Sequence, residues 1–158
     1  MESQRITPAL QLLRSFSRVN KTMMRFVQKT AADNGLSVPQ FTILVTIAPE
    51  KEMTQKSIGE KTFLPKSTLS QAVDGLVQAG FLHRQQVEDN RREMLLSLSR
   101  QGETMLKGIH RQEGSIHQLT AGALETLSEE EFAGLLQAHQ QIADFFDEKA
   151  AEQEEDAK

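Results

Sequence analysis

Residues 54–102 read TQKSIGEKTFLPKSTLSQAVDGLVQAGFLHRQQVEDNRREMLLSLSRQG, and the order of patterns in this segment decides the fold of the chain. Two short helix patterns come first. Two strand patterns follow, around the polar tip Asp-Asn-Arg-Arg at 89–92, and then the helix start Ser-Arg-Gln-Gly at 99–102. A helix pair can hold a reading helix against duplex DNA, and a basic hairpin tip beside it can reach a neighbouring groove. The segment therefore predicts a module that binds duplex DNA.

The first half of the segment predicts a helix-turn-helix. Thr54 is expected to cap a helix over residues 55–61, and Pro65 is expected to begin a second helix. Gly80 has the position of a C′ glycine, with Phe81 as its hydrophobic contact. The apolar stripe of the second helix consists of Leu69, Val73, Leu76 and Val77.

The first turns of this second helix carry polar side chains suited to DNA. Ser, Thr and Gln side chains bond to base edges or phosphates, and a helix N-terminus favours phosphate oxygens. The alternative is a solvated helix start, since Pro-Lys-Ser-Thr can begin a helix of any function. The residues predicted here to contact DNA are Lys66, Ser67, Thr68, Ser70 and Gln71.

The second half of the segment predicts a β-hairpin. Residues 81–87 and 94–98 have strand patterns, and the polar stretch 88–93 is predicted to form a long loop between them. Arg91 and Arg92 at the tip could enter a minor groove, where arginine responds to groove width and negative potential. Asp89 is expected to pair with an arginine or to cap the turn. The alternative interpretation is an ordinary charged hairpin.

Long helices are predicted at both ends of the chain. Thr7-Pro8 begins a helix of about 25 residues that ends at Asn34-Gly35, and residues 37–49 hold a shorter helix. After the hairpin, Ser99 is expected to cap one long helix, interrupted by glycines, that extends to Leu119. Helices this long at chain ends usually pack against a partner outside their own core, often a second subunit.

The last helix is predicted from a capping box formed by Ser128 and Glu131. Beyond it, residues 150–158 contain only Ala, Glu, Gln, Asp and Lys. Such a stretch is too polar to pack, so we expect a disordered acidic tail there.

The composition is that of an ordinary soluble protein. Of the 158 residues, 38% are hydrophobic and 25% are charged. Cys is absent, which excludes disulfides, thiolate metal ligands and cysteine nucleophiles. There is no apolar run near about 18 residues and no charged-then-apolar leader, so we expect a cytoplasmic protein.

The net charge of −4 conceals a strong asymmetry along the chain. Residues 1–53 carry 7 basic and 4 acidic groups, and residues 54–100 carry 7 and 5. Residues 125–158 carry 2 basic against 11 acidic groups. Because screening acts over about 8–10 Å, an acidic tail can coexist with a basic DNA-binding face.

Several stretches resemble the MarR family. LSVPQF at 36–41, TQKSIGE at 54–60, and ST at 67–68 with VDGLVQAGFLHR at 73–84 follow the family pattern. DNRR at 89–92 and LSLSRQG at 96–102 resemble its Asp-x-Arg wing followed by Leu-Ser/Thr-x-x-Gly. The resemblance covers about residues 7–146, and the wing is its most specific part. Gly59 and Gly75 are mild departures, and Gly75 is expected to allow close packing on the wing.

The resemblance implies a winged helix-turn-helix protein that is mainly α with a small β-hairpin wing. Its expected parts are an N-terminal dimerisation helix (1–35), the DNA-binding domain (36–102), C-terminal dimerisation helices (103–149) and the tail (150–158). It implies a homodimer that binds a pseudo-palindromic operator in double-stranded DNA and usually represses transcription, with release by a small-molecule effector. By match, Ser67, Thr68, Ser70 and Gln71 lie on the recognition helix and Arg91 at the wing tip. The other predicted contacts are Arg92, Thr54 and Gln55.

Further candidate sites are weaker. Phe16, Met23, Phe26 and Phe41 could line a ligand pocket, although each also fits a plain core position. His110, Glu113 and His117, at spacings of three and four on one helix, could ligate zinc, but such groups more often lie on a surface or an interface. No cofactor is predicted. No nucleophile, phosphate loop or second carboxylate with motif spacing lies nearby, so we do not expect an enzyme.

The basic face of the first helix allows two interpretations. At 100° per residue it gathers Arg14, Arg18, Lys21, Arg25 and Lys29 within about 80°. It is either a solvated face or a surface that pairs with the partner subunit's acidic last helix.

Two functions therefore remain after the sequence alone. One is a dimeric DNA-binding repressor released by a ligand. The other is a metal- or ligand-binding interaction module on the same fold, without specific reading of DNA.

Overall fold

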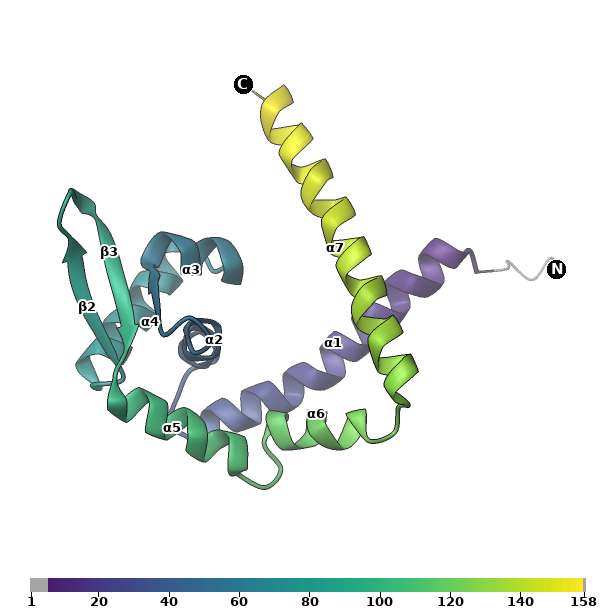
Figure 1. Cartoon of the computed structure of the whole chain (residues 1–158), viewed down its shortest axis with the longest axis horizontal. Coiled ribbons are helices and arrows are strands. Elements are labelled where there is room, and N and C mark those ends of the chain that lie inside the picture. The colour runs from purple at the N-terminus through teal and green to yellow at the C-terminus, as the bar shows by residue number, and fades with distance from the viewer. Residues whose placement is uncertain (1–5, 158) are drawn as a thin grey trace. The chain divides into compact units, whose positions relative to one another are not determined.

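The computed structural model describes residues 6–157, with the side chain of Arg91 also outside the described part. Two compact units divide the chain, residues 1–118 and 119–158. The elements, labelled in Figure 1, are α1 Pro8–Asp33, α2 Val38–Ile47, β1 Glu52–Thr54, α3 Gln55–Thr62, α4 Lys66–Gln78, β2 Leu82–Val87, β3 Asn90–Leu98, α5 Arg100–Arg111, α6 Ile116–Leu124 and α7 Glu129–Asp156. The expectation of a mainly helical fold with a small wing is confirmed.

Side-chain caps fix where the first helices begin. The Thr7 hydroxyl accepts a hydrogen bond from the Leu10 N–H at 3.2 Å, as the sequence predicts for α1. Gly35 follows α1 with a φ of +69°, the left-handed conformation that glycine adopts at low cost. Ser37 and Gln40 then form a reciprocal capping box at the start of α2.

The core of the first unit lies among α2, α3, α4, α5 and the sheet. Ile43, Leu44 and Ile47 of α2 are fully buried, together with Ile58 of α3. The predicted inner face of α4 is buried at Leu69, Val73 and Leu76. Burial of this stripe leaves the opposite face of α4 free for a partner.

A strand that sequence reasoning missed, β1, completes a three-stranded antiparallel sheet of order β1-β3-β2. Met53 of β1 pairs with Leu96, and Thr54 with Leu95. Three residues are too few for an alternating pattern, and the pairing partner lies about forty residues away, so no local signal marks this strand. β1 leads directly into α3 and fixes the start of that helix beside the base of the wing.

The hairpin is tighter than expected. β2 ends at Val87 and β3 begins at Asn90, so the turn holds only Glu88 and Asp89. The predicted loop 88–93 is therefore wrong. Val87 pairs with Asn90 while Gln86 pairs with Met94, so residues 91–93 form a bulge inside β3. Because the bulge lies within β3, Arg91 and Arg92 belong to the strand and not to a loop.

The long helix expected from Ser99 to Leu119 is broken into α5 and α6. Gly114 has a φ of +74° in the connection. The end of α1 holds this break in place, because the Thr30 hydroxyl accepts the Ile116 N–H at 3.0 Å and Asn34 Nδ2 donates to Gln112 Oε1 at 2.8 Å. These long-range bonds outweigh the helical pattern of the local sequence.

The second unit is dominated by α7. Ser128 and Glu131 form the predicted capping box. The helix continues to Asp156, so the expectation of disorder from residue 150 is wrong over 150–156. Ala, Glu and Gln favour helix, and Lys149 pairs with Glu152 one turn on at 2.8 Å. A stretch too polar to pack can still be helical.

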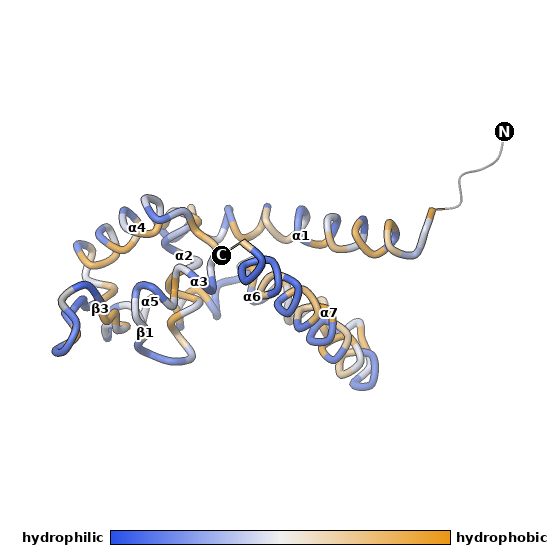
Figure 2. The backbone as a smooth tube through the Cα atoms, turned by 90° about the horizontal axis from the view of Figure 1, so that it is seen from above, coloured by the Kyte–Doolittle hydropathy of each residue, from blue (hydrophilic) through white to orange (hydrophobic). Residues whose placement is uncertain are grey.

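Large apolar side chains are exposed on both long terminal helices. In Figure 2 the hydropathy colouring shows apolar positions along α1 and α7. On α1 the exposed set is Leu10, Leu12, Leu13, Val19, Met23, Met24 and Phe26. On α7 it is Phe132, Leu135, Leu136, Phe145 and Phe146. Within the described part of the chain, no helix is both long and apolar enough to cross a membrane.

Gly75 of α4 lies against α2 and not against the wing. A Cβ atom on Gly75 would come within 2.6 Å of Gln40 Nε2. The amide of Gln40 belongs to the capping box of α2, so this glycine leaves room for a helix cap. The expectation that Gly75 allows close packing on the wing is wrong.

Candidate nucleic-acid interface

The start of α4 presents free polar groups. Pro65 occupies the N-cap and provides no side-chain hydrogen bond to the first turn. The N–H groups of that turn are therefore uncapped by side chains, and they carry the positive end of the helix dipole. Such a terminus favours an anionic partner, above all where a lysine stands beside it.

The predicted reading residues divide by exposure. Lys66, Ser67 and Gln71 are exposed, while Thr68 and Ser70 are half-buried beside the apolar stripe. Asp74, which sequence reasoning did not single out, continues the exposed face one turn beyond Gln71. All five predicted residues lie on the first two turns of α4.

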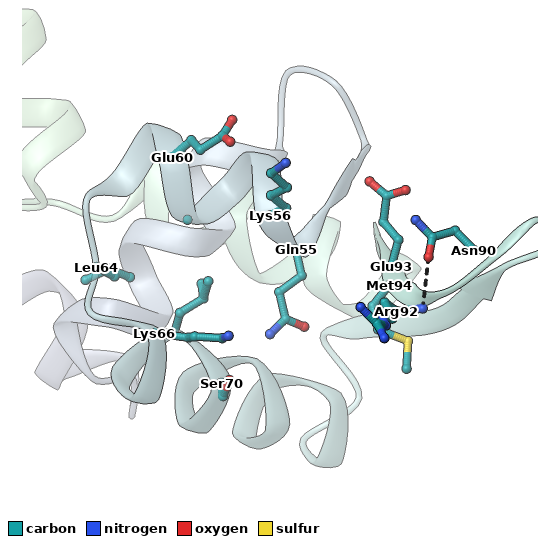
Figure 3. A pocket seen from close by; sticks show the side chains of 12 residues that line it. Gln55, Lys56, Glu60, Leu64, Lys66, Ser70, Asn90, Arg92, Glu93 and Met94 are labelled. Carbon is teal, nitrogen blue, oxygen red and sulfur yellow. Dashed lines mark hydrogen bonds between the residues drawn. The ribbon is translucent and has the colours of Figure 1, made fainter. Parts of the chain in front are cut away.

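A hollow of about 840 Å³ separates α4 from the wing. It is lined by Gln55, Lys56, Gly59, Glu60, Leu64, Lys66, Leu69, Ser70, Asn90, Arg92, Glu93 and Met94. Figure 3 shows the side chains of Gln55 and Lys66 extending toward one another, with Arg92 on the opposite side from Leu64. The hollow thus joins four of the predicted contacts, Gln55, Lys66, Ser70 and Arg92.

The charges around this hollow are mixed, with a basic excess. Lys56, Lys66 and Arg92 face two carboxylates, Glu60 and Glu93. In Figure 3 the Glu60 side chain points away from Lys66 and Gln55. The hollow therefore offers cations from α3, α4 and β3, which suits an anion that passes between the helix pair and the wing.

Asn90 shapes the wing tip. Its Oδ1 atom accepts the Arg92 N–H at 3.1 Å, which holds the bulge (Figure 3). The role expected of Asp89, which is to pair with an arginine or to cap the turn, stays a prediction. Arg92 is exposed. The backbone of Arg91 lies in β3, and its side chain is outside the described part of the structure.

Two contacts set the position of α4 relative to the wing. Arg84 Nη1 of β2 lies 2.5 Å from Asp74 Oδ1 of α4. The Ser99 hydroxyl donates to the Gly80 carbonyl at 2.6 Å and accepts the Gly102 N–H at 2.9 Å. The end of β3 and the start of α5 are thereby tied to the end of α4. Sequence spacing gives no sign of the Arg84–Asp74 pair.

Thr54 and Gln55 have different roles at the start of α3. The Thr54 hydroxyl accepts the Ser57 N–H at 3.1 Å, so this side chain caps the helix. Gln55 lines the hollow instead. Lys56 lies next to Gln55 and also lines the hollow, although it was not predicted as a contact. The signal that could have identified it is a basic side chain in the first turn of α3.

The weak ligand-pocket set has no part in this hollow. Phe41 is a core residue, 4% exposed, and its ring meets His117 edge-on with the ring centroids 6.4 Å apart. Met23 and Phe26 are exposed on α1, and Phe16 is half-buried. A pocket built from these four residues stays a prediction.

The zinc candidates form a pair and not a triad. The rings of His110 and His117 lie 3.9 Å apart, with their planes tilted by 43°. Within the described part of the chain, no three His, Asp or Glu side chains are placed to hold a metal ion, so Glu113 does not complete a set. His117 Nδ1 is buried without a hydrogen-bond partner.

The histidine pair predicts a pH dependence of stability. Burial, and secondly the nearby His110, lower the pKa of His117 below its usual 6.5. As the pH falls below 6.5, His117 is protonated in the unfolded chain at a higher pH than in the folded chain. The free energy of unfolding should therefore fall as the pH drops toward the pKa of the folded chain. Urea titrations between pH 8 and 5 measure this. His117→Gln should flatten the dependence, and an equal dependence in the variant would contradict it.

A known protein family matches the part of the chain that forms the hollow. The family model described as the MarR family matches residues 34–93, which span α2, α3, α4, β2 and the first part of β3. Over this part of its length the chain is similar to the MarR family. The region that the family model matches contains every lining residue of the hollow except Met94.

The chain is also similar to individual regulators of transcription and to solved structures. It is 25% identical to the HTH-type transcriptional repressor YetL of Bacillus subtilis over 101 residues, which cover 63% of this chain and 60% of that protein. The transcriptional regulator BldR from Sulfolobus solfataricus has a TM-score of 0.73 at 20% identity, covering 89% and 98% of the two chains. A MarR mutant from E. coli, complexed with operator DNA, has a TM-score of 0.70 at 20% identity, covering 89% and 99%. The two solved structures share the winged-helix fold of this chain.

Proposed function

We propose that this protein is a member of the MarR family, and that it is a homodimeric, cytoplasmic regulator of transcription that binds a pseudo-palindromic operator in double-stranded DNA. The observation that carries the proposal is the hollow between α4 and the wing. It brings Lys56, Lys66 and Arg92 from three separate elements around one space beside an uncapped helix start. A phosphate strand that follows this space would have α4 on one side and the wing on the other.

The dimensions of α4 suit the major groove. Its 13 residues span about 20 Å, and a major groove about 12 Å wide admits one helix. Ser67 and Gln71 are exposed one turn apart and would meet base edges, while Lys66 would meet phosphate. Arg92, with Arg91 beside it in sequence, would reach the adjacent minor groove.

The exposed apolar faces of α1 and α7 support a homodimer. Leu13 is 60% exposed and Phe146 is 62% exposed in the single chain. A helix that exposes several large apolar side chains is unusual on a monomer, and such apolar surface often marks a protein interface. A second copy of the chain would cover it and would also set the distance between two copies of α4.

Leu13→Glu is expected to weaken dimerisation at least about tenfold, because it places a charge in an apolar interface. The matched control is Gln11→Glu, which adds the same charge at an exposed polar position of α1. Sedimentation equilibrium measures the dimer constant. If the two variants had equal dimer constants, Leu13 of α1 would not lie in the interface.

The salt dependence of the same constant tests the basic face of α1. If Arg14, Arg18 and their neighbours pair with the acidic end of the partner's α7, high salt should weaken the dimer. A constant that does not change with salt would assign these cations to solvent. Lys29 already pairs with Asp33 of its own helix at 2.5 Å.

We propose further that the protein represses transcription and is released by a small-molecule effector. The relative YetL is named a repressor, which supports the first part. Two recognition helices must lie about one helical turn apart to enter successive major grooves. An effector need prefer a dimer with another spacing by only about 1–3 kcal/mol to lower operator affinity.

Titration of the purified protein with duplexes from its own upstream region, against a random duplex and over a salt series, tests the proposal. Specific binding that persists at physiological salt supports it. Weak binding that is equal for both duplexes and vanishes with salt would favour an interaction module without specific reading.

A further inference from the structure

Phe63 is the most exposed large apolar side chain in the described part of the chain. It follows α3 as its C-cap and is 89% exposed. Its backbone has a φ of +54° and a ψ of 22°, the left-handed conformation. Neither its backbone nor its ring is in the environment that phenylalanine favours.

The folded chain gains little from a phenylalanine here. The left-handed region suits glycine and asparagine, and it is disfavoured for a bulky L-residue. A ring this exposed contributes almost no burial in return. Residues held in such conformations cluster at functional sites, where a partner makes use of the side chain.

The turn that carries Phe63 is fixed, so the ring is held outward. The Phe63 N–H donates to the Gly59 carbonyl at 3.0 Å, and the Thr62 hydroxyl donates to the Ile58 carbonyl at 2.7 Å. The next residue, Leu64, lines the hollow on the side away from Arg92 (Figure 3). Phe63 therefore borders the candidate interface at the end opposite the wing.

The surroundings of Phe63 select the kind of partner. Lys61 and Lys66, both exposed, lie two residues before and three residues after it. An apolar ring with an exposed lysine on either side of it in the sequence suits the apolar surface of another protein poorly, because both ammonium groups would lose water there. It does match a duplex, which offers deoxyribose rings and thymine methyl groups between phosphates.

We propose that Phe63 is an apolar DNA contact that packs on deoxyribose or a thymine methyl group at the edge of the operator. This role rests on the proposed DNA binding of the chain. The ring adds affinity without neutralising a phosphate, so its contribution does not depend on salt. It extends the interface from the hollow to the turn between α3 and α4.

Phe63→Gly tests this role, because glycine relieves the backbone and removes the ring. We expect the variant to be at least as stable as the natural chain to urea, and to bind the operator about five- to tenfold more weakly. The slope of affinity against salt should stay the same. Phe63→Leu, which keeps an apolar side chain, should retain most of the affinity. If Phe63→Gly is as stable to urea as the natural chain, misfolding cannot explain its weaker binding.

The outcomes separate this proposal from the proposed function. Specific binding by the natural chain with equal affinity in Phe63→Gly would overturn the role of Phe63 alone. A changed dimer constant in Phe63→Gly would assign the ring to a protein contact and also overturn it. Absence of specific binding by the natural chain would overturn both proposals.

A duplex with deoxyuridine in place of thymidine identifies the surface that the ring meets. If the ring packs on a methyl group, the natural chain should lose affinity on this duplex and Phe63→Gly should not. If it packs on deoxyribose, both proteins should bind the two duplexes alike while Phe63→Gly stays weaker on each. A loss that is equal for both proteins would place the methyl contact elsewhere, and the Phe63→Gly deficit itself still decides the role of the ring.

Discussion

Gly102→Ala is expected to lower the free energy of unfolding by about 3 kcal/mol, because the added methyl group has no room. A Cβ atom at this position would lie 2.3 Å from the Phe81 carbonyl oxygen and 2.8 Å from Leu98 Cδ1. The carbonyl is backbone and also accepts the Ser99 N–H at 3.0 Å. It cannot move without loosening the junction of β3 and α5.

The same junction connects stability to the interface. Ser99 bonds both to Gly102 and to the end of α4 at Gly80, so a shift of α5 would displace α4 relative to the wing. We therefore expect Gly102→Ala to weaken DNA binding also, through altered spacing. The thermal midpoint should fall by about 10 °C.

Gly108→Ala is the matched control. It lies in the same helix, and a Cβ there meets nothing within 4 Å. Because alanine favours helix over glycine, stability should be unchanged or higher by up to about 1 kcal/mol. Urea denaturation at equal chain concentration compares the two. Equal stability of both variants would contradict the packing described for the junction.

Lys66→Ala and Arg92→Ala should each lower operator affinity about tenfold, at unchanged dimer content. The two side chains stand on opposite walls of the hollow, one on α4 and the other on β3. Each is expected to meet a phosphate or a groove edge, so the slope of log affinity against log salt should fall by about one for each lost phosphate contact. Arg91→Ala is expected to weaken binding likewise.

Lys107→Ala controls for the loss of one positive charge. Lys107 is exposed on α5 in the same compact unit and is not among the residues that line the hollow. Fluorescence anisotropy with a labelled duplex gives the affinities. If Lys66→Ala and Arg92→Ala bound as tightly as Lys107→Ala, the hollow would not be the DNA site.

The local elements of this fold could be predicted well from the sequence. Thr7, Thr54 and Ser128 cap the helices that their positions predicted, because capping depends on residues within one turn. Gly80 ends α4 in a left-handed conformation for the same reason. Helical periodicity alone was enough to place the predicted contact residues of α4 in the first turns of that helix.

What depends on distant pairing could not be predicted. β1 exists because it pairs with β3, and the break before α6 exists because Thr30 receives the Ile116 N–H. The left-handed Phe63 has no sequence signature, since phenylalanine is a poor choice for that conformation. Lys56 and Asn90 line the hollow because α3 and β3 lie side by side in the fold, and the local sequence gives no sign of this.

Selection of binding sites from a random duplex library, with the purified natural chain at physiological salt, tests the central claim most directly. The proposed dimer, with two copies of α4 and two wings, predicts enrichment of a pseudo-palindrome whose half-site centres lie about 10–10.5 base pairs apart. Substitutions in α4 at Ser67 or Gln71 should change the enriched bases without changing that spacing. A library that stays random, or that yields a single half-site, would contradict the account.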